Sequence, residues 1–240
     1  MIFVVIPVYN EEQNLLNLYN VLCSFPFEDD AYFVFSDDGS SDLTVPMIKS
    51  LFIQKNMVVL SDGVNRGPGF VFNRAFEWVI QKSVNQNDVI LTIEADCTSD
   101  LAILPNLLAI NKLGYDLVLA SIYAQGGGFY KTTFSRRLIS TIANLFFRFL
   151  FNVQVLTISS FYRVYSIALL KKVKQQYDVL ISENGFICML EILLKSISCN
   201  AKIIEVPMTL NSNKRIGKSK MKIFRTICEY LIFVTSFKKK

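Results

Sequence analysis

The chain has 240 residues, a formal net charge of +5 and a hydrophobic content of 52%, including 20 Phe. This length accommodates one large α/β domain or two small ones, and the apolar residues suffice for a sizeable core. The chain contains no His, which excludes Ser-His-Asp catalysis, His-ligated zinc and the usual general base at neutral pH. Its 5 Cys are dispersed and form no C-x-x-C pair, as is typical of packing residues in a reduced, cytoplasmic protein.

The first half of the chain alternates apolar runs with helical segments. The pattern predicts a strand at 2–8, a helix at 11–25, a strand from 31 that ends in an acidic turn, and a helical piece after Pro46. A strand at 56–62 follows, and then a glycine-containing loop and helix at 65–84. The last three predicted elements are a strand at 88–96, a helix at 101–114 and a strand at 115–123. Strands that alternate with helices indicate a mostly parallel sheet with helices on both faces. Ligands bind such sheets at the carboxyl ends of the strands, where this chain places PVYNEE, SDDGSSD, VNRGPG and EADCTSD.

The pattern changes from Gly126 onwards. A glycine-rich entry leads into a stretch at about 135–155 with apolar residues at helical spacing, namely Leu138, Ile142, Leu145, Phe146, Phe149 and Leu150. Asn144 and Arg148 interrupt it, whereas a membrane-spanning helix needs roughly 20 mainly apolar residues. We therefore expect an amphipathic helix at a membrane surface, with a helix packed on the core as the alternative. A helix, a turn and a strand are predicted at 186–210.

The carboxyl-terminal end is strongly basic. Residues 202–240 hold ten Lys or Arg and two acidic residues, so the other 201 residues carry a net charge of −3. Such an end favours an anionic partner, although a solvated tail has the same composition. KRIGKSKMK has no interleaved aromatic residues, so we expect no nucleic-acid partner. A last helix at 221–240 has an uncharged run too short to span a membrane, and we expect it to lie on one.

Two carboxylates close the predicted strand at 88–96. Glu94 and Asp96 are two residues apart, so on an extended strand their side chains point to the same side. Like charges repel, and the pair costs stability unless a cation lies between them. A strand that leaves the core for solvent, with Asp100 as the N-cap of the next helix, is the simpler alternative.

Eight segments occur in a fixed order over about residues 2–222: PVYNEE, SDDGSSD, NRGPG, EAD, GGGFY, FSRRLIS, SSFYRVY and EVPMTLNSNKRIGKSKM. Together they resemble the inverting family 2 glycosyltransferases of the GT-A fold, and most of all the polyprenyl-phosphate (dolichyl-phosphate) mannose or glucose synthases. The resemblance implies a Rossmann-like, mostly parallel sheet with helices on both faces, plus amphipathic interfacial helices. It implies a glycosyltransferase domain at 1–211, followed at 212–240 by a basic mobile loop and an amphipathic helix.

The same resemblance implies the residues of the site. Nucleotide-sugar binding falls to Pro7, Tyr9, Glu11, Asp37, Asp38, Asn65, Gly67, Glu94, Ala95 and Asp96. Glu94 and Asp96 match the family's D-x-D and would hold Mg²⁺ or Mn²⁺, which carboxylate oxygens suit, with Thr98 as a further candidate ligand. The acceptor phosphate and the diphosphate would be held by Arg136, Arg137, Lys214, Arg215, Lys218 and Lys220. Asp96 and Arg136 are the residues to which the resemblance gives catalytic roles.

The implied reaction moves a hexose from a UDP- or GDP-sugar to a polyprenyl (dolichyl or undecaprenyl) phosphate with inversion. A phosphate monoester has a second pKa of about 6, so the acceptor attacks without a general base and the absence of His is no obstacle. Such an acceptor places the enzyme peripherally at the cytoplasmic face of a membrane, with a separate membrane-spanning subunit as a candidate partner. The start MIFVVIPVYNEE lacks the basic n-region of a signal peptide, in agreement with a cytoplasmic location.

Several positions depart from the family pattern. They are Glu94 in place of the first Asp, Ile122 in place of an Arg, Leu156 and Ser160 in place of an Asp and a Gly, and Phe70 and Val71 in place of small residues. These departures keep open a non-catalytic relative that binds nucleotide without turnover. A family 2 enzyme acting on a saccharide or other hydroxyl acceptor in cell-envelope polysaccharide synthesis is also open, and it needs a general base such as Glu183. A dinucleotide-binding oxidoreductase is set aside because GPGFVF lacks the G-x-G-x-x-G spacing.

Overall fold

The computed structural model describes residues 1–25, 27, 31–217, 229–230 and 232–234, and the side chains of Ser135 and Arg136 fall outside that description. Within these residues a seven-stranded sheet has the order β3-β2-β1-β4-β7-β5-β8. Its strands are β1 (Ile2–Val8), β2 (Ala31–Asp37), β3 (Met57–Leu60), β4 (Val89–Thr92), β5 (Leu117–Ser121), β7 (Arg163–Ser166) and β8 (Ile203–Pro207). All neighbours pair in parallel except β7, which runs antiparallel to β4 and β5.

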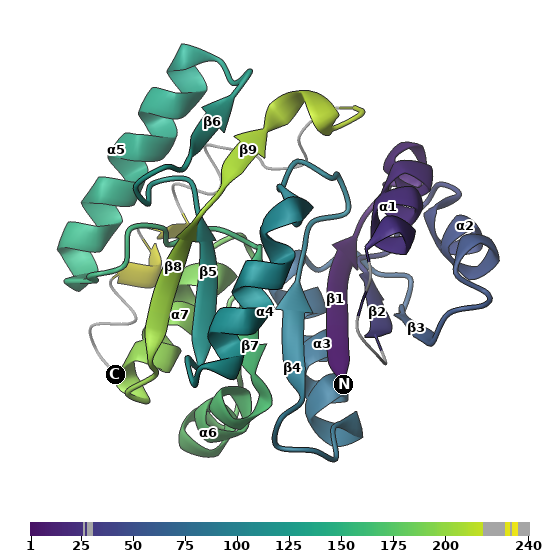
Figure 1. Ribbon diagram of the computed structural model, residues 1–240, viewed down its shortest axis with the longest axis horizontal. Helices are drawn as coiled ribbons and strands as arrows, with labels where there is room; N and C mark the ends of the chain where they lie inside the picture. Colours follow the sequence, from purple (N-terminus) through teal and green to yellow (C-terminus); the bar gives the residue numbers. More distant parts are fainter. Residues whose placement is uncertain (26, 28–30, 218–228, 231, 235–240) are drawn as a thin grey trace.

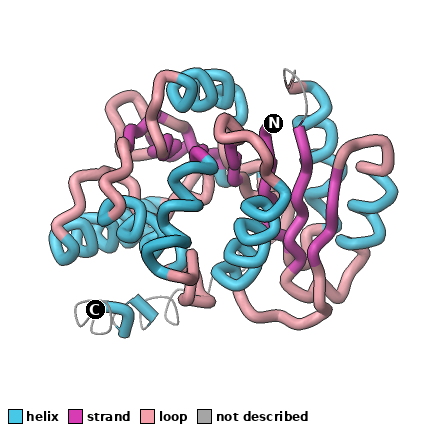
Figure 2. The backbone as a smooth tube through the Cα atoms, turned by 90° about the horizontal axis from the view of Figure 1, so that it is seen from below, coloured by secondary structure: helices cyan, strands magenta, loops and turns pink. Residues whose placement is uncertain are grey.

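Helices cover both faces of this sheet (Figures 1 and 2). One apolar cluster joins the sheet to α3 (Pro68–Lys82), α6 (Ile167–Tyr177) and α7 (Cys188–Ser198), and another joins it to α1 (Glu12–Ser24), α2 (Thr44–Leu51) and α4 (Leu104–Lys112). Along β1, Phe3 and Val5 belong to the first cluster and Val4 and Ile6 to the second, which is the two-residue alternation of a strand. The predicted α/β sheet with helices on both faces is confirmed.

The segment after β4 differs from its prediction. The strand ends at Thr92, two residues before Glu94, so the carboxylate pair lies in the following loop and not on an extended strand. The loop does not leave the core for solvent either, since Asp96 is only 4% exposed. Asp100 does cap the helical turn η1 (Leu101–Ile103), because its side chain accepts the Ala102 N–H at 3.1 Å.

The helix α2 also begins earlier than predicted, at Thr44 and not after Pro46. Pro46 therefore lies in the first turn, where a helix has no use for the missing backbone N–H and the fixed φ of proline is already helical.

The predicted amphipathic helix is α5 (Phe134–Phe151), and it has two different faces. On one face Asn144 and Phe147 are buried, at 6% exposure each. The other face exposes Phe134, Leu138, Ile139, Ile142, Leu145, Phe146 and Phe149. The helix therefore packs on the core with one face, as the second alternative expects, and leaves an apolar stripe uncovered on the other. Its place at a membrane surface stays a prediction. Among the described residues, no helix is both long and apolar enough to cross a membrane.

The described residues of the last segment pack under α5. Tyr230 and Phe233 are buried, and their rings contact those of Phe147 and Phe151, with centroids 4.4 and 5.9 Å apart, whereas Ile232 is 68% exposed. One side of this segment is thus held by the protein itself. The division of the chain at 211 and 212 stays a prediction, because most of 218–240 lies outside the described residues.

Candidate active site

The loops that follow β1 and β2 are locked to each other. The Asn10 N–H donates to Ser40 Oγ at 2.9 Å, and the Ser41 N–H donates back to Asn10 Oδ1 at 2.8 Å. The Glu11 N–H donates to Thr44 Oγ1 at 2.7 Å. Asn10 has a φ of 51°, a left-handed conformation that Asn tolerates better than most residues. These bonds fix the place of Tyr9 and Glu11, two of the predicted nucleotide contacts, at the carboxyl edge of the sheet.

Asp37 and Asp38 both hold backbone in place. Asp37 accepts the Ser40 N–H at 3.1 Å and the Ser61 hydroxyl at 2.7 Å. Asp38 accepts hydrogen bonds from the N–H groups of Arg66 at 2.7 Å and Gly67 at 3.0 Å. Burial raises the pKa of the Asp38 carboxyl, and these two hydrogen bonds offset only part of that effect. The predicted nucleotide residues Asn65 and Gly67 thus lie in a loop that Asp38 positions. The described hydrogen bonds of both carboxylates are thus with groups of the protein, and their predicted contacts with a nucleotide stay a prediction.

Gly67 itself has no room for a side chain. Its φ is 97°, and an added Cβ would lie 2.4 Å from the carbonyl oxygen of Asn184. The adjoining Gly39, at a φ of 73°, would bring a Cβ within 2.8 Å of the backbone nitrogen of Asn65. Three loops therefore meet backbone to backbone at this corner, which requires glycine.

The carboxylate pair lies beside a guanidinium. Asp96 Oδ2 accepts the Nε–H of Arg215 at 2.6 Å and also pairs with its Nη2, while Asp96 Oδ1 accepts the Thr98 N–H at 3.0 Å and the Thr98 hydroxyl at 2.8 Å. Burial raises the pKa of Glu94 to about 8, and the negative charges of Asp96 and, to a smaller extent, Glu11 add to the increase. The positive charge of Arg215 acts in the opposite direction. Two carboxylates at this spacing do not both ionise without a nearby positive charge.

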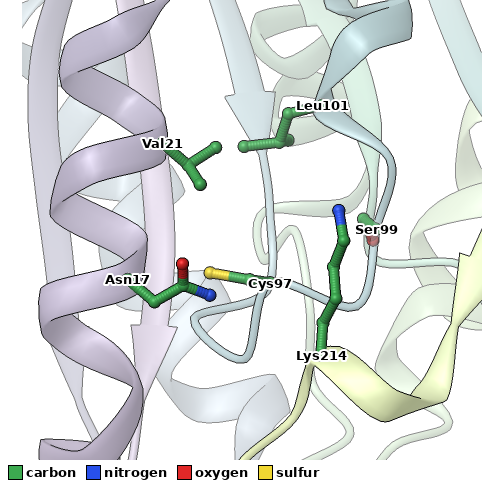
Figure 3. Close-up of a pocket in the computed structure, with 6 residues that line it drawn as sticks. All are labelled: Asn17, Val21, Cys97, Ser99, Leu101 and Lys214. Atoms are coloured by element: carbon green, nitrogen blue, oxygen red, sulfur yellow. The ribbon is translucent and has the colours of Figure 1, made fainter.

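The segment after β8 carries Arg215 to this place. Strand β9 (Thr209–Asn211) pairs with β6 (Gly128–Tyr130), and this small sheet follows the carboxyl ends of β8 and β5 (Figure 1). The helical turn η2 (Ser212–Lys214) comes next. Figure 3 shows Lys214 reaching the loop of Cys97 and Ser99, opposite Asn17 of α1, around a cavity of about 170 Å³. The structure thus brings together the predicted residues Glu11, Glu94, Asp96, Thr98, Lys214 and Arg215.

The predicted acceptor residues are less well represented. Lys218, Lys220 and the side chain of Arg136 lie outside the described residues. Arg137 is exposed, donates to the Phe129 carbonyl at 3.1 Å and lies over the Phe129 ring, so its described contacts are with β6. Ile122, which replaces a family Arg, packs at the edge of the apolar core.

Three residues with positioning contacts were not predicted from the sequence. The Glu205 carboxylate accepts the N–H groups of Leu156 at 2.6 Å and Thr157 at 2.8 Å, and so holds the loop in which the family has its Asp. The ring of Phe70, unexpected after Gly69, has the guanidinium of Arg66 at 4.4 Å. Asn14 hydrogen-bonds the backbone of Ile216. A partner 202 positions away leaves no signal in local sequence. Arg66 precedes the start of α3 at Pro68, so helical spacing does not predict its contact with Phe70 either.

The residues around Asp96 fit a divalent cation. The described residues contain no group of three or more His, Cys, Asp or Glu that could hold a metal by themselves. They do offer two adjacent carboxylates, one of which already binds the positive charge of Arg215, and hard cations such as Mg²⁺ prefer such oxygens and commonly take further ligands from substrate phosphates.

Comparison with known proteins identifies the family. The model of glycosyl transferase family 2 matches residues 3–174. The chain belongs to glycosyl transferase family 2. It is 27% identical over 221 residues to polyprenol monophosphomannose synthase of Mycolicibacterium smegmatis, a match that covers 91% of this chain and 80% of that protein. It is 30% identical over 235 residues to dolichol-phosphate mannosyltransferase of Pyrococcus furiosus, covering 95% of this chain but only 61% of the relative. The predicted family and enzyme class, a glycosyltransferase, are confirmed.

Solved structures share the fold. Glucosyl-3-phosphoglycerate synthase of Mycobacterium tuberculosis, crystallised with Mn²⁺, UDP and phosphoglyceric acid, superposes with a TM-score of 0.66 at 17% identity, over 98% of this chain and 77% of that one. S. aureus TarS 1–349 in complex with UDP-GlcNAc gives a TM-score of 0.59 at 21% identity, over 90% and 59% of the two chains. The GT-A fold predicted for this chain is confirmed.

Proposed function

We propose that this enzyme transfers a hexose, with inversion, from a UDP- or GDP-sugar to a polyprenyl phosphate at the cytoplasmic face of a membrane. The observation that carries the proposal is the Glu94–Asp96 pair at the carboxyl edge of the sheet, with the basic segment of Lys214 and Arg215 lying on it. The names of the relatives support the acceptor, because three that match over 91% or more of this chain are synthases or transferases of polyprenyl, dolichyl or undecaprenyl phosphate mannose.

The donor half of the site would bind the nucleotide between three loops. Pro7, Tyr9 and Glu11 would lie on one side of it, and Asn65 and Gly67, held by Asp38, on the other. Glu94 and Asp96, with Ala95 between them, would hold Mg²⁺ or Mn²⁺, which when bound offsets the negative charge of the leaving diphosphate. Lys214 and Arg215 supply further positive charge to the same phosphates.

The acceptor half needs no proton transfer. With a second pKa of about 6, a phosphate monoester is largely dianionic at neutral pH, so its oxygen attacks the anomeric carbon directly. What the protein must supply is a cationic group that orients this phosphate, and Arg136 of α5, with Arg137 beside it, is the proposed clamp. This chemistry agrees with a chain that contains no His.

The uncovered stripe of α5 would bring the acceptor to this clamp. Phe149 is 88% exposed and Phe134 79%, and five further apolar side chains lie between them on the same helix. Arg137 is exposed on this helix and Arg148 partly so. Apolar side chains flanked by Arg are the composition of helices that bind the surface of membranes with anionic lipids. The same helix would therefore bind both the membrane and the headgroup of the lipid acceptor.

A transfer assay tests the proposal. Purified protein, Mn²⁺ or Mg²⁺ and a panel of radiolabelled UDP- and GDP-hexoses are mixed with a polyprenyl phosphate, and the label in the organic phase is counted. We expect transfer from one donor, its loss with EDTA, and a decrease of at least about 100-fold in Asp96→Asn, the order expected when a group aimed at the developing charge is removed. Asp178→Asn, an exposed acid at the end of α6, is the matched control and should keep full activity.

Other outcomes separate the alternatives. Transfer to a saccharide hydroxyl, with none to polyprenyl phosphate, would contradict the proposed acceptor and favour an enzyme with a general base. Saturable, metal-dependent nucleotide binding without transfer to any acceptor would favour a non-catalytic relative.

A further inference from the structure

The carboxylate expected to bind the cation is fully occupied by donors of the protein. Asp96 is 4% exposed. Its Oδ1 accepts two hydrogen bonds from Thr98, and its Oδ2 accepts two from the guanidinium of Arg215, of which the Nε–H bond is 2.6 Å long. A divalent cation needs a lone pair of this carboxylate. Arg215 therefore lies at the Asp96 oxygen that a cation would use.

The backbone beside Arg215 is clamped by one buried side chain. The Ile216 N–H donates to Asn14 Oδ1 at 2.9 Å, and Asn14 Nδ2 donates to the Ile216 carbonyl at 3.1 Å. Asn14 is 3% exposed and its Nδ2 also donates to Glu11 Oε2 at 2.6 Å. A carboxamide that pairs with both polar groups of one residue fixes that residue in place. Ile216 itself is 53% exposed, so burial of its side chain contributes less to its position than it would in the core.

A second anchor holds the other side of Arg215. The Asn211 N–H donates to the Thr98 carbonyl at 3.0 Å, and the Thr132 and Ser212 hydroxyls are 2.7 Å apart. The segment 211–216 is thus fastened at both ends, with its guanidinium directed at Asp96. This pre-organisation lowers the entropy lost when a long, flexible Arg side chain is ordered.

We propose that Arg215 and the divalent cation compete for Asp96 Oδ2, and that Asn14 is a positioning residue that sets how strongly Arg215 competes. Before the cation binds, the 211–216 segment closes the site on itself. Cation binding requires Arg215 to leave Asp96, and its released positive charge is then available to the diphosphate. This inference rests on the metal-dependent reaction proposed above, but it concerns binding of the ion to the protein alone.

Binding of Mn²⁺ to the protein without nucleotide tests the competition. Free Mn²⁺ is measured by its electron paramagnetic resonance signal in wild type, Arg215→Gln and Asn14→Leu. Lys214→Gln is the control for the first variant, since it removes the same charge one residue away. Asn20→Leu, at an exposed position of the same helix α1, is the control for the second.

We expect Arg215→Gln to bind Mn²⁺ about tenfold more tightly than Lys214→Gln, since one charge-assisted contact no longer competes. Asn14→Leu should bind about threefold more tightly than Asn20→Leu, because only the positioning of Arg215 is lost. Equal Mn²⁺ affinities within either pair, or no binding by any of the proteins, would overturn the inference. Loss of sugar transfer with these affinity differences intact would count against the proposed function and not against the competition.

Hydrogen exchange of one amide gives a second readout in the unaltered protein. Among the described residues, the Ile216 N–H donates to the Asn14 carboxamide and to no other group. We expect saturating Mg²⁺ to accelerate its exchange, measured by NMR, by about fivefold or more, because opening of the 211–216 segment breaks that bond. Exchange that is unchanged or slower with Mg²⁺ would contradict the coupling of Arg215 to the Asn14 contact that the proposal assigns.

Discussion

Replacing Glu191 by Ala would show how far a buried ion pair supports the loop beside the site. Glu191 of α7 is 1% exposed, Lys195 is 6% exposed, and their charged groups are 2.7 Å apart. The Glu191 carboxylate also accepts the N–H groups of Ser182 at 3.0 Å and Glu183 at 2.9 Å. Through these bonds α7 holds the 182–185 segment, whose carbonyl groups lie against the glycine loop at 67–69.

The expected loss follows from what the substitution leaves behind. Without Glu191, the buried ammonium of Lys195 keeps, among the described residues, only neutral partners, the carbonyls of Val179 and Leu180 and the ring of Tyr177. Breaking a buried pair by removing one partner costs about 3–5 kcal/mol, and we expect the free energy of unfolding to decrease by that amount. Two backbone N–H groups also lose their acceptor, which adds to the loss of stability. We therefore expect the loss to lie in the upper half of that range, at about 4–5 kcal/mol.

The measurement is urea unfolding followed by circular dichroism, with Glu77→Ala as the control. Glu77 pairs with Lys174 between α3 and α6, where the side chains are 24% and 37% exposed, and an exposed pair contributes about 0–1 kcal/mol. A loss below about 3 kcal/mol for Glu191→Ala, or one equal to that of the control, would refute the reasoning that burial makes this pair indispensable.

Three further predictions concern the loops and the exposed helix. Gly67→Ala should lower the free energy of unfolding more than Gly63→Ala, since both residues have positive φ but only the Cβ at Gly67 would meet a backbone oxygen, at 2.4 Å. The left-handed backbone alone costs about 1–2 kcal/mol in either variant. Equal losses of the two variants in urea unfolding would contradict the steric argument. Burial raises the pKa of Asp38 above 3.8, so the folded state binds the proton more tightly than the unfolded state does. The free energy of unfolding therefore falls as pH rises between the unfolded and folded pKa values. Asp38→Asn should remove this pH dependence, measured by urea unfolding at several pH values. Phe149→Asp should lower sedimentation with anionic liposomes at least about fivefold, as charge on an interfacial face does, whereas Val84→Asp, at a position 96% exposed, should not.

Much of the sheet could be predicted from local pattern. Runs such as 2–8 and 117–120 are apolar throughout because strands inside such a sheet are covered on both faces. The polar segments that follow them had to converge at the carboxyl edge. Glu94 and Asp96 were found in this way. The antiparallel β7 was not, because its four residues, Arg163–Ser166, are too few to show a period and a fully buried Arg163 reads as a surface residue in sequence.

Other errors have local physical causes. The predicted strand through Asp96 was four residues too long, since the apolar residues that continue past Thr92 belong to a buried loop and not to the ladder. The nucleotide contacts of Asp37 and Asp38 stay a prediction, but their hydrogen bonds to backbone N–H groups of the loops could not be read from the sequence. A carboxylate can accept several hydrogen bonds, and backbone N–H groups that are out of water must find acceptors. Which acceptor they find depends on loops that meet only after folding.

The sequence by itself determined the family, the alternation of strands and helices up to β5 and the identity of the acidic and basic residues at one edge, because these depend on residue type and short spacing. Only the tertiary structure decided which of those charges meet. Arg215 reaches Asp96 across 119 positions, and Asn14 reaches Ile216 across 202. The tertiary fold decides which residues so distant in sequence come into contact. Away from water, one well-placed hydrogen-bond partner stabilises a polar group more than several partners that are merely nearby in sequence.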